Sequence, residues 1–260
     1  MPSHELHARW AKMICGASFD WVDKLVDSGP MPKKRTKSVE EIVERFKRGL
    51  MYGAWTNIEI ERGVHDSSRL DCSEFMELAG EVYSKAGEVG LCNLVLHHYL
   101  DKIPKILRGL SWKIRRREMS RADLVELIRT SLEIEASVLF LIRYWDKITG
   151  SPSPDIEVDN IIRDMAKHIP GRLARNTIRR KGNVIIRIMA SCHDLDSNLI
   201  EVLRRTEEKV RKSIEMHLSD IVCDIISENP GLMQWDDVAM AKVSKILECR
   251  APQQKPPNIV

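Results

Sequence analysis

The apolar residues of this chain recur mostly three and four positions apart, the spacing that places them on one face of an α-helix. The segment that follows Ser120 illustrates this, with apolar residues at Leu124, Leu127, Ile128, Leu132, Ala136, Leu139 and Phe140. The period-two alternation of Val, Ile and Thr that marks β-strands is almost absent. The pattern therefore predicts an all-α protein, a multi-helix globular bundle of about nine helices with little or no sheet.

Capping and breaking residues divide this pattern into separate helices. Ser38 with Glu41, and Ser120 with Asp123, place an N-cap serine three residues before an acidic residue. Gly29-Pro30 should end one helix and Pro104 should interrupt another, because proline has no N–H to donate. The expected helices include His4 to Ile14, Ser18 to Gly29, Ser38 to Gly63, Asp71 to Lys85, Leu91 to Leu107, Ser120 to Lys147, Asp155 to His168, Ser197 to Ser227 and Trp235 to Leu247.

The clearest break in the chain is the segment Gly150-Ser-Pro-Ser-Pro154. It predicts an N-terminal helical domain over residues 1–150. Residues 151–249 then form either a second helical domain or a continuation of the same bundle. Residues 250–260 contain three prolines and are expected to be a flexible tail unless a partner orders them. The tail could engage a neighbouring copy, so a homo-oligomer is one expectation.

Composition narrows the class of protein. The chain has 260 residues, of which 43% are hydrophobic, so a large core is expected. No apolar stretch approaches the roughly 20 residues that a membrane span requires, and the N-terminus lacks the layout of a secretory signal. The six cysteines form no C-x-x-C pair and are expected to be reduced thiols. We therefore expect a cytoplasmic protein without a membrane partner.

Five of the eight histidines occur within the first 98 residues: His4, His7, His65, His97 and His98. His4 lies three positions before His7, and His97 four positions before Asp101, so each pair shares a helix face. His65-Asp66 is a contiguous doublet. Imidazole with carboxylate suits Zn, Mn, Fe or Ni, whereas carboxylate with water suits Mg or Mn. The sequence thus predicts a divalent metal ion held by residues from the set His4, His7, His65, Asp66, His97, His98 and Asp101.

The order His, His-Asp, His-His, Asp on a helical scaffold resembles the HD superfamily of metal-dependent phosphohydrolases. The resemblance covers roughly Ser3 to Asp101. The superfamily includes nucleotidases, cyclic-nucleotide hydrolases and the nuclease domains of CRISPR interference helicases. It implies that Asp66 is a metal ligand or the base, and that Arg69 meets the negative charge that develops on the phosphoryl group. It also implies a metal-bound water of lowered pKa. Asp123 and Asp146 are alternatives to Asp101 as the last metal-binding aspartate.

Basic residues cluster in two windows. One extends from Lys102 to Arg121 and the other from Arg163 to Arg187, each with eight basic residues and one acidic residue, whereas the whole chain has a net charge of only +3. Such segregation is typical of phosphate-backbone binding. The residues expected to contact DNA, RNA or another polyanion are Lys113, Arg115, Arg116, Arg117, Arg172, Arg175, Arg179, Arg180 and Lys181. Trp112 could stack on an unpaired base.

Two function hypotheses follow. The first is a metal-dependent phosphohydrolase or nuclease. The second is a non-enzymatic, helical nucleic-acid-binding or assembly protein that uses the two basic windows. A plainer interpretation remains open for both features. His193-Asp194 shows that a His-Asp doublet also arises without further ligands nearby, and charge runs on helices are usually solvated faces.

Overall fold

The computed structural model describes residues 2–28, 72–136, 139, 142–145, 197–228, 231–232 and 236–249. Within these ranges the protein is all-α, as predicted, with six helices rather than about nine. They are α1 (His4–Cys15), α2 (Asp20–Ser28), α5 (Cys72–Arg116), α6 (Arg121–Glu135), α11 (Ser197–Glu228) and α13 (Asp237–Leu247). The helices expected at Ser38 to Gly63 and at Asp155 to His168 lie outside the described residues.

The helix α5 corrects one prediction. The sequence places a break near Pro104, but the helix continues through Pro104, and its non-helical residue is Gly87, with φ 58° and ψ −150°. Glycine has no Cβ to clash in that conformation. Ile103 and Leu107, on either side of Pro104, are fully buried. Their packing holds the helix together despite the roughly 3 kcal/mol that an internal proline costs.

The helix α6 begins as predicted and ends earlier. The Ser120 hydroxyl accepts from the Asp123 N–H, and the Asp123 carboxylate accepts from the Ser120 N–H, which completes the capping box. The predicted continuation to Lys147 is wrong, because the backbone leaves the helix at Ala136. After this turn the buried side chains of Leu139 and Ile142 bring Arg143 next to Glu207 of α11.

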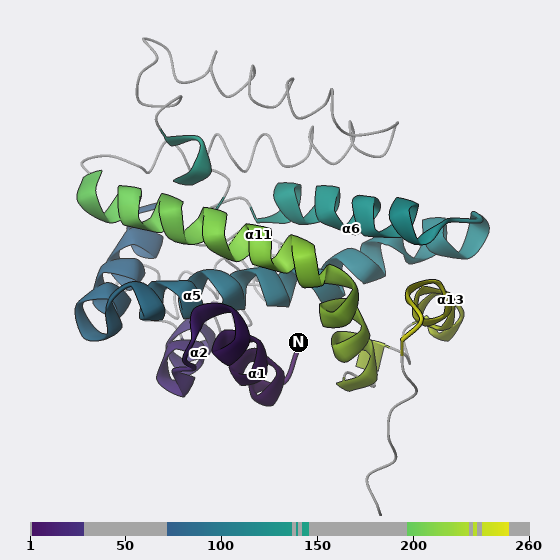
Figure 1. Cartoon of the computed structure of the whole chain (residues 1–260), viewed down its shortest axis with the longest axis horizontal. Helices are drawn as coiled ribbons and strands as arrows, with labels where there is room; N and C mark the ends of the chain where they lie inside the picture. Colours follow the sequence, from purple (N-terminus) through teal and green to yellow (C-terminus); the bar gives the residue numbers. More distant parts are fainter. Residues whose placement is uncertain are drawn as a thin grey trace, which may run out of the picture.

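All six helices contribute to one hydrophobic core with α5 at its centre. Helices α1 and α2 pack together against the middle of α5, and α13 packs near its C-terminal end (Figure 1). Helices α6 and α11 lie along α5, and α11 also contacts α1. The sharing of this core by α5 and α11 fits a continuous bundle. The predicted boundary at residues 150–154 and the tail at 250–260 lie outside the described residues, so the domain division stays a prediction.

Four cysteines are paired, contrary to the expectation of reduced thiols. Cys15 of α1 is bonded to Cys92 of α5, and Cys223 of α11 to Cys249, which follows α13. The Cα–Cα distances of 5.6 and 5.2 Å lie in the ordinary range for disulfides. The partners are 77 and 26 residues apart in sequence, so their approach depends on tertiary packing. None of the described helices is long and apolar enough to cross a membrane.

Candidate metal centre

Three helices bring histidines and aspartates together. The loop between α1 and α2 is short, and Gly16 allows its turn with a φ of 86°. Asn93 of α5 fixes this loop, because its Oδ1 accepts from the Phe19 N–H and its Nδ2 donates to the Ala17 carbonyl. The Cys15–Cys92 disulfide joins α1 to α5 at the same level. The two short helices are thereby held against α5, with His7 and Asp23 buried among their apolar contacts.

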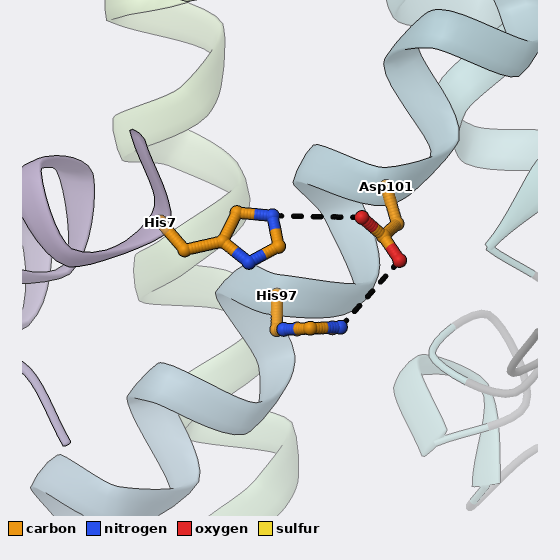
Figure 2. Close-up of side chains that lie close together, drawn as sticks. All are labelled: His7, His97 and Asp101. Carbon is orange, nitrogen blue, oxygen red and sulfur yellow. Dashed lines mark ion pairs between the residues drawn. The ribbon is translucent and has the colours of Figure 1, made fainter. Parts of the chain in front are cut away.

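His7 of α1, and His97 and Asp101 of α5, form the resulting group. Each offers one ligand atom, and these atoms lie within 4.8 Å of one another. His7 Nε2 is 3.5 Å from Asp101 Oδ1, and His97 Nε2 is 3.5 Å from Asp101 Oδ2 (Figure 2). Two ligand atoms on a tetrahedral ion, each at 2.0–2.2 Å from it, are roughly 3.4 Å apart. The two histidine–aspartate separations, which end on different oxygens of Asp101, therefore match the spacing of ligands around one metal ion.

The same atoms lack hydrogen-bond partners. Both nitrogens of His7, Nε2 of His97 and both oxygens of Asp101 are buried and make no hydrogen bond. His7, His97 and Asp101 have only 4%, 1% and 4% of their surfaces exposed. A separation of 3.5 Å exceeds the 2.7–3.2 Å of an N–H···O hydrogen bond. A buried polar group without a hydrogen bond costs free energy, which ion pairs with Asp101 offset when the rings carry protons and which a bound cation would offset when they do not.

Asp23 of α2 orients the His97 ring. Its Oδ1 forms a 2.8 Å hydrogen bond with His97 Nδ1, and both side chains are buried. A proton on Nδ1 leaves the lone pair of Nε2 free to face Asp101. Metal-binding histidines usually have such a carboxylate on their second nitrogen, where it fixes the tautomer and raises the basicity of the ligand. His7 Nδ1 also faces this carboxylate, at 3.6 Å.

The electrostatics of the group favour positive charge on the rings. Burial lowers the pKa of His97, but Asp101, Asp23 and Asp27 outweigh burial and hold this pKa well above its ordinary value of 6.5. Burial also lowers the pKa of His7, but Asp101 and Asp23 outweigh burial, so this pKa is raised as well. Burial raises the pKa of Asp23, yet the two imidazoles lower it to about 2, and they hold that of Asp101 well below its usual range. One divalent cation could replace the two ring protons without changing the total charge.

The other predicted metal ligands do not join this group. His4 is half exposed and pairs with Asp20 and Asp27 of α2. The ring of His98 contacts Phe75 and His97 instead, at centroid distances of 5.6 and 5.9 Å. Of the alternatives to Asp101, Asp123 serves the α6 capping box, and Asp146 lies outside the described residues. His65, Asp66 and Arg69 also lie outside them, so their roles stay predictions.

Sequence reasoning missed Asp23 and Asp27. Both follow Asp20 in α2, at positions i+3 and i+7, and this spacing places all three on one face of a helix. The same signal that singled out His4 with His7 was therefore present in the next helix.

The first basic window does not form one exposed surface. Lys102 is buried, and the Arg115 guanidinium lies 2.7 Å from Asp236 Oδ2. Arg116 lies over the ring of Trp112, with Cζ 4.8 Å from the ring centroid, and Trp112 is 60% exposed. Lys113 is partly buried and Arg117 is exposed. The residues of the second window, Arg172, Arg175, Arg179, Arg180 and Lys181, lie outside the described residues.

Comparison of the chain with protein-family models, curated proteins and solved structures found no match. The resemblance to the HD superfamily therefore stays a prediction, and the proposals below rest on the residues themselves.

Proposed function

We propose that this protein binds one divalent transition-metal ion through His7 Nε2, His97 Nε2 and an oxygen of Asp101. The observation that carries the proposal is that these buried atoms lack hydrogen-bond partners, and that each imidazole Nε2 stands 3.5 Å from an oxygen of Asp101, a separation typical of metal ligands. The ion would join α1 to α5, and Asp23 of α2 would support one of its ligands. Its first effect is therefore to stabilise the packing of the N-terminal helices.

The ligand types narrow the choice of ion. Two imidazoles with one carboxylate suit Zn, Fe, Ni or Mn better than Mg, which prefers oxygen ligands and retains water. Among these ions, affinity for a given site rises along the series from Mn²⁺ to Ni²⁺, and Zn²⁺ accepts the tetrahedral geometry without preference from its d-electrons. We therefore expect Zn²⁺ to bind and Co²⁺ to report the site by its visible absorption.

The test is a calorimetric titration of the chelator-treated full-length protein with Zn²⁺, together with elemental analysis. Wild-type protein should bind one ion per chain. Both His97→Ala and Asp101→Asn should lose this binding. His217→Gln is the matched control, because His217 contacts the ring of Trp10 and lies outside the ligand group. Absence of binding in the wild type, or equal binding in Asp101→Asn, would contradict the proposal.

Phosphohydrolase activity is a further step of this proposal. An ion with three protein ligands keeps a coordination position that water could occupy, and such a water is activated toward attack on phosphate esters. The resemblance of residues 3–101 to the HD superfamily points to the same chemistry. The low exposure of the three ligands weighs against it, because a substrate must reach the ion.

Hydrolysis can be measured with a nitrophenyl phosphodiester, with single-stranded DNA and with RNA, on protein loaded with Mn²⁺ or Zn²⁺. Activity that disappears in Asp101→Asn and persists in His217→Gln supports a phosphohydrolase or nuclease. Activity that is the same in Asp101→Asn would come from a contaminant, and the absence of turnover would leave a metal-stabilised helical protein.

A nucleic-acid-binding or assembly function is the second candidate, and the exposed pair Trp112 and Arg116 favours it. An indole with a guanidinium over it offers an unpaired base both a stacking surface and a positive charge. Arg108, one helical turn before Trp112, and Arg117 are also exposed and extend the positive charge along the end of α5. The expected partner is single-stranded nucleic acid, bound through its phosphates and bases.

Fluorescence anisotropy with single-stranded DNA and RNA would test this candidate over a range of salt concentrations. Affinity should fall with salt. Trp112→Ala with Arg116→Ser should cost at least about 1 kcal/mol of binding, the lower end of the stacking range. The control is Lys212→Ser, which removes an exposed cation from α11. No binding at low salt would remove the candidate.

The predicted cytoplasmic location is untested, and the two disulfides weigh against a reducing compartment.

A further inference from the structure

Imidazoles and carboxylates continue from the metal centre toward the surface. Asp20, Asp23 and Asp27 share one face of α2, and this face meets His4 of α1 and His97 of α5. Carboxylates and imidazoles therefore alternate along a path from solvent to the buried centre. We call His4, Asp20 and Asp27 the outer group.

The outer group is accessible to ions in solution. The side chains of His4 and Asp20 are 50% and 62% exposed. His4 Nδ1 lies 3.7 Å from Asp20 Oδ1, and His4 Nε2 lies 3.2 Å from Asp27 Oδ2. The two carboxylates thus approach opposite nitrogens of one ring and do not converge on one point. The second oxygen of Asp20 pairs with Lys24 Nζ at 2.6 Å. The outer group therefore attracts a further cation without holding it tightly.

Asp27 connects the outer group to the buried centre. Its second oxygen, Oδ1, lies 3.5 Å from His97 Nε2, and the same nitrogen lies 3.5 Å from Asp101 Oδ2. His97 is only 1% exposed, and this nitrogen makes no hydrogen bond. This nitrogen therefore faces one carboxylate of the outer group and one of the buried centre.

We propose that His4, Asp20 and Asp27 form a capture site for divalent transition-metal ions, and that Asp27 passes the ion to His97 and Asp101. The inference rests on the proposed metal centre. An ion that exchanges one ligand at a time stays coordinated, which avoids the large cost of moving a bare charge into the protein interior.

A capture site and a ligand make different kinetic predictions. A path that lowers the barrier does so in both directions, so its loss slows entry and release by the same factor and leaves the Kd unchanged. Loss of a ligand speeds release and raises the Kd. His4 was a predicted ligand, so this difference decides its role.

The experiment uses the full-length protein and Co²⁺ alone. Stopped-flow absorbance records uptake of Co²⁺, and a chase with excess chelator records its release. His4→Ala and Asp20→Asn, both at exposed positions and so tolerated by the fold, remove the outer group in two ways. Glu5→Gln is the matched control, because Glu5 is an exposed acid beside His4 and belongs to neither of the ion pairs of the outer group.

Both variants should slow uptake and release by roughly tenfold, while Glu5→Gln stays close to wild type. One bound ion per chain and the Kd should not change. Unchanged rates would overturn the capture site, and a raised Kd with faster release would make His4 a ligand instead. If the wild type binds no ion at equilibrium, the proposed metal centre itself is wrong and the capture site falls with it.

Discussion

Two buried polar clusters lie on the same stretch of α5 and differ in how their charges are satisfied. Tyr99 lies between His97 and Asp101 in sequence but faces α11. Its hydroxyl donates to Glu207 Oε1 at 2.5 Å, and Arg143 Nη2 donates to the same oxygen at 2.6 Å and to the Tyr99 oxygen at 3.0 Å. In the His7–His97–Asp101 group the corresponding separations are 3.5 Å.

The difference shows what each cluster needs. Tyr99, Glu207 and Arg143 satisfy one another by hydrogen bonds without a ligand. Among the described residues of this cluster, only Arg211 Nε is buried without a hydrogen bond, 3.5 Å from Glu207 Oε1. In the histidine–aspartate group, both nitrogens of His7, Nε2 of His97 and both oxygens of Asp101 are buried and make no hydrogen bond. The two clusters thus differ in how many of their buried polar atoms make hydrogen bonds, although both combine acidic with basic groups.

The largest expected effect comes from breaking the network of Tyr99, Glu207 and Arg143. Glu207 is fully buried, so Glu207→Ala leaves the Arg143 guanidinium without its anion and should lower the free energy of unfolding by roughly 3–5 kcal/mol. Urea unfolding measures this loss. The loss should be the same with and without chelator, since no ion belongs to this network. A loss that appears only with chelator would mean that the two clusters are one unit.

Removal of the metal should have the next largest effect. At a free ion concentration about 100 times the Kd, binding adds about 2.7 kcal/mol to the free energy of unfolding, and chelator should remove this contribution. Asp101→Asn keeps the shape of the side chain and should no longer respond to chelator. Differential scanning calorimetry records both. A chelator response that persists in Asp101→Asn would place the ion elsewhere.

A smaller effect is expected from Asp23, which supports His97 without belonging to the three ligands. Asp23→Asn can still accept the Nδ1 proton but lacks the negative charge, so metal affinity should fall by about 10- to 100-fold with one ion still bound per chain. Competition with a chelator of known affinity measures the change. Equal affinities in variant and wild type would show that Asp23 only packs against the ring.

The smallest expected effect is a pH dependence that distinguishes the clusters. Without metal, the raised pKa values of His7 and His97 contribute stability that is present below 6.5 and lost as pH rises through the folded values. The lowered pKa of Asp23 contributes stability that is present above 3.8 and lost as pH falls toward about 2. The contribution of the group is therefore greatest between these ordinary values, at mildly acidic pH.

The metal reverses this trend above neutrality, because its ligands must lose their protons to bind. The increment that Zn²⁺ adds to the melting temperature should grow between pH 6 and 8 by the equivalent of about 1 kcal/mol. In Glu207→Ala the growth should be unchanged, since burial raises the pKa of Tyr99 well above its ordinary value and keeps it protonated at these pH values. An increment that does not vary with pH would argue against imidazole ligands.

Helix periodicity and capping residues predicted the individual residues of the site but not that these residues lie close together. The spacing of His97 and Asp101 put both on one face of α5, and the positions of α1, α11 and the α6 cap followed from periodicity and capping residues. That α1 packs on α5 next to His97, and that His98 turns to Phe75, depend on contacts between distant segments. For the same reason the pairing of Arg115 with Asp236 was not predictable, and tertiary packing overrode the helix-breaking tendency of Pro104.

The most direct test of the metal centre is a crystal of the Zn²⁺-loaded protein measured at the zinc absorption edge. We predict one anomalous peak per chain, at ~2.0–2.2 Å from His7 Nε2, His97 Nε2 and an Asp101 oxygen. A peak absent from this position in protein that carries stoichiometric zinc, or these three side chains hydrogen-bonded to one another with no ion between them, would contradict the account.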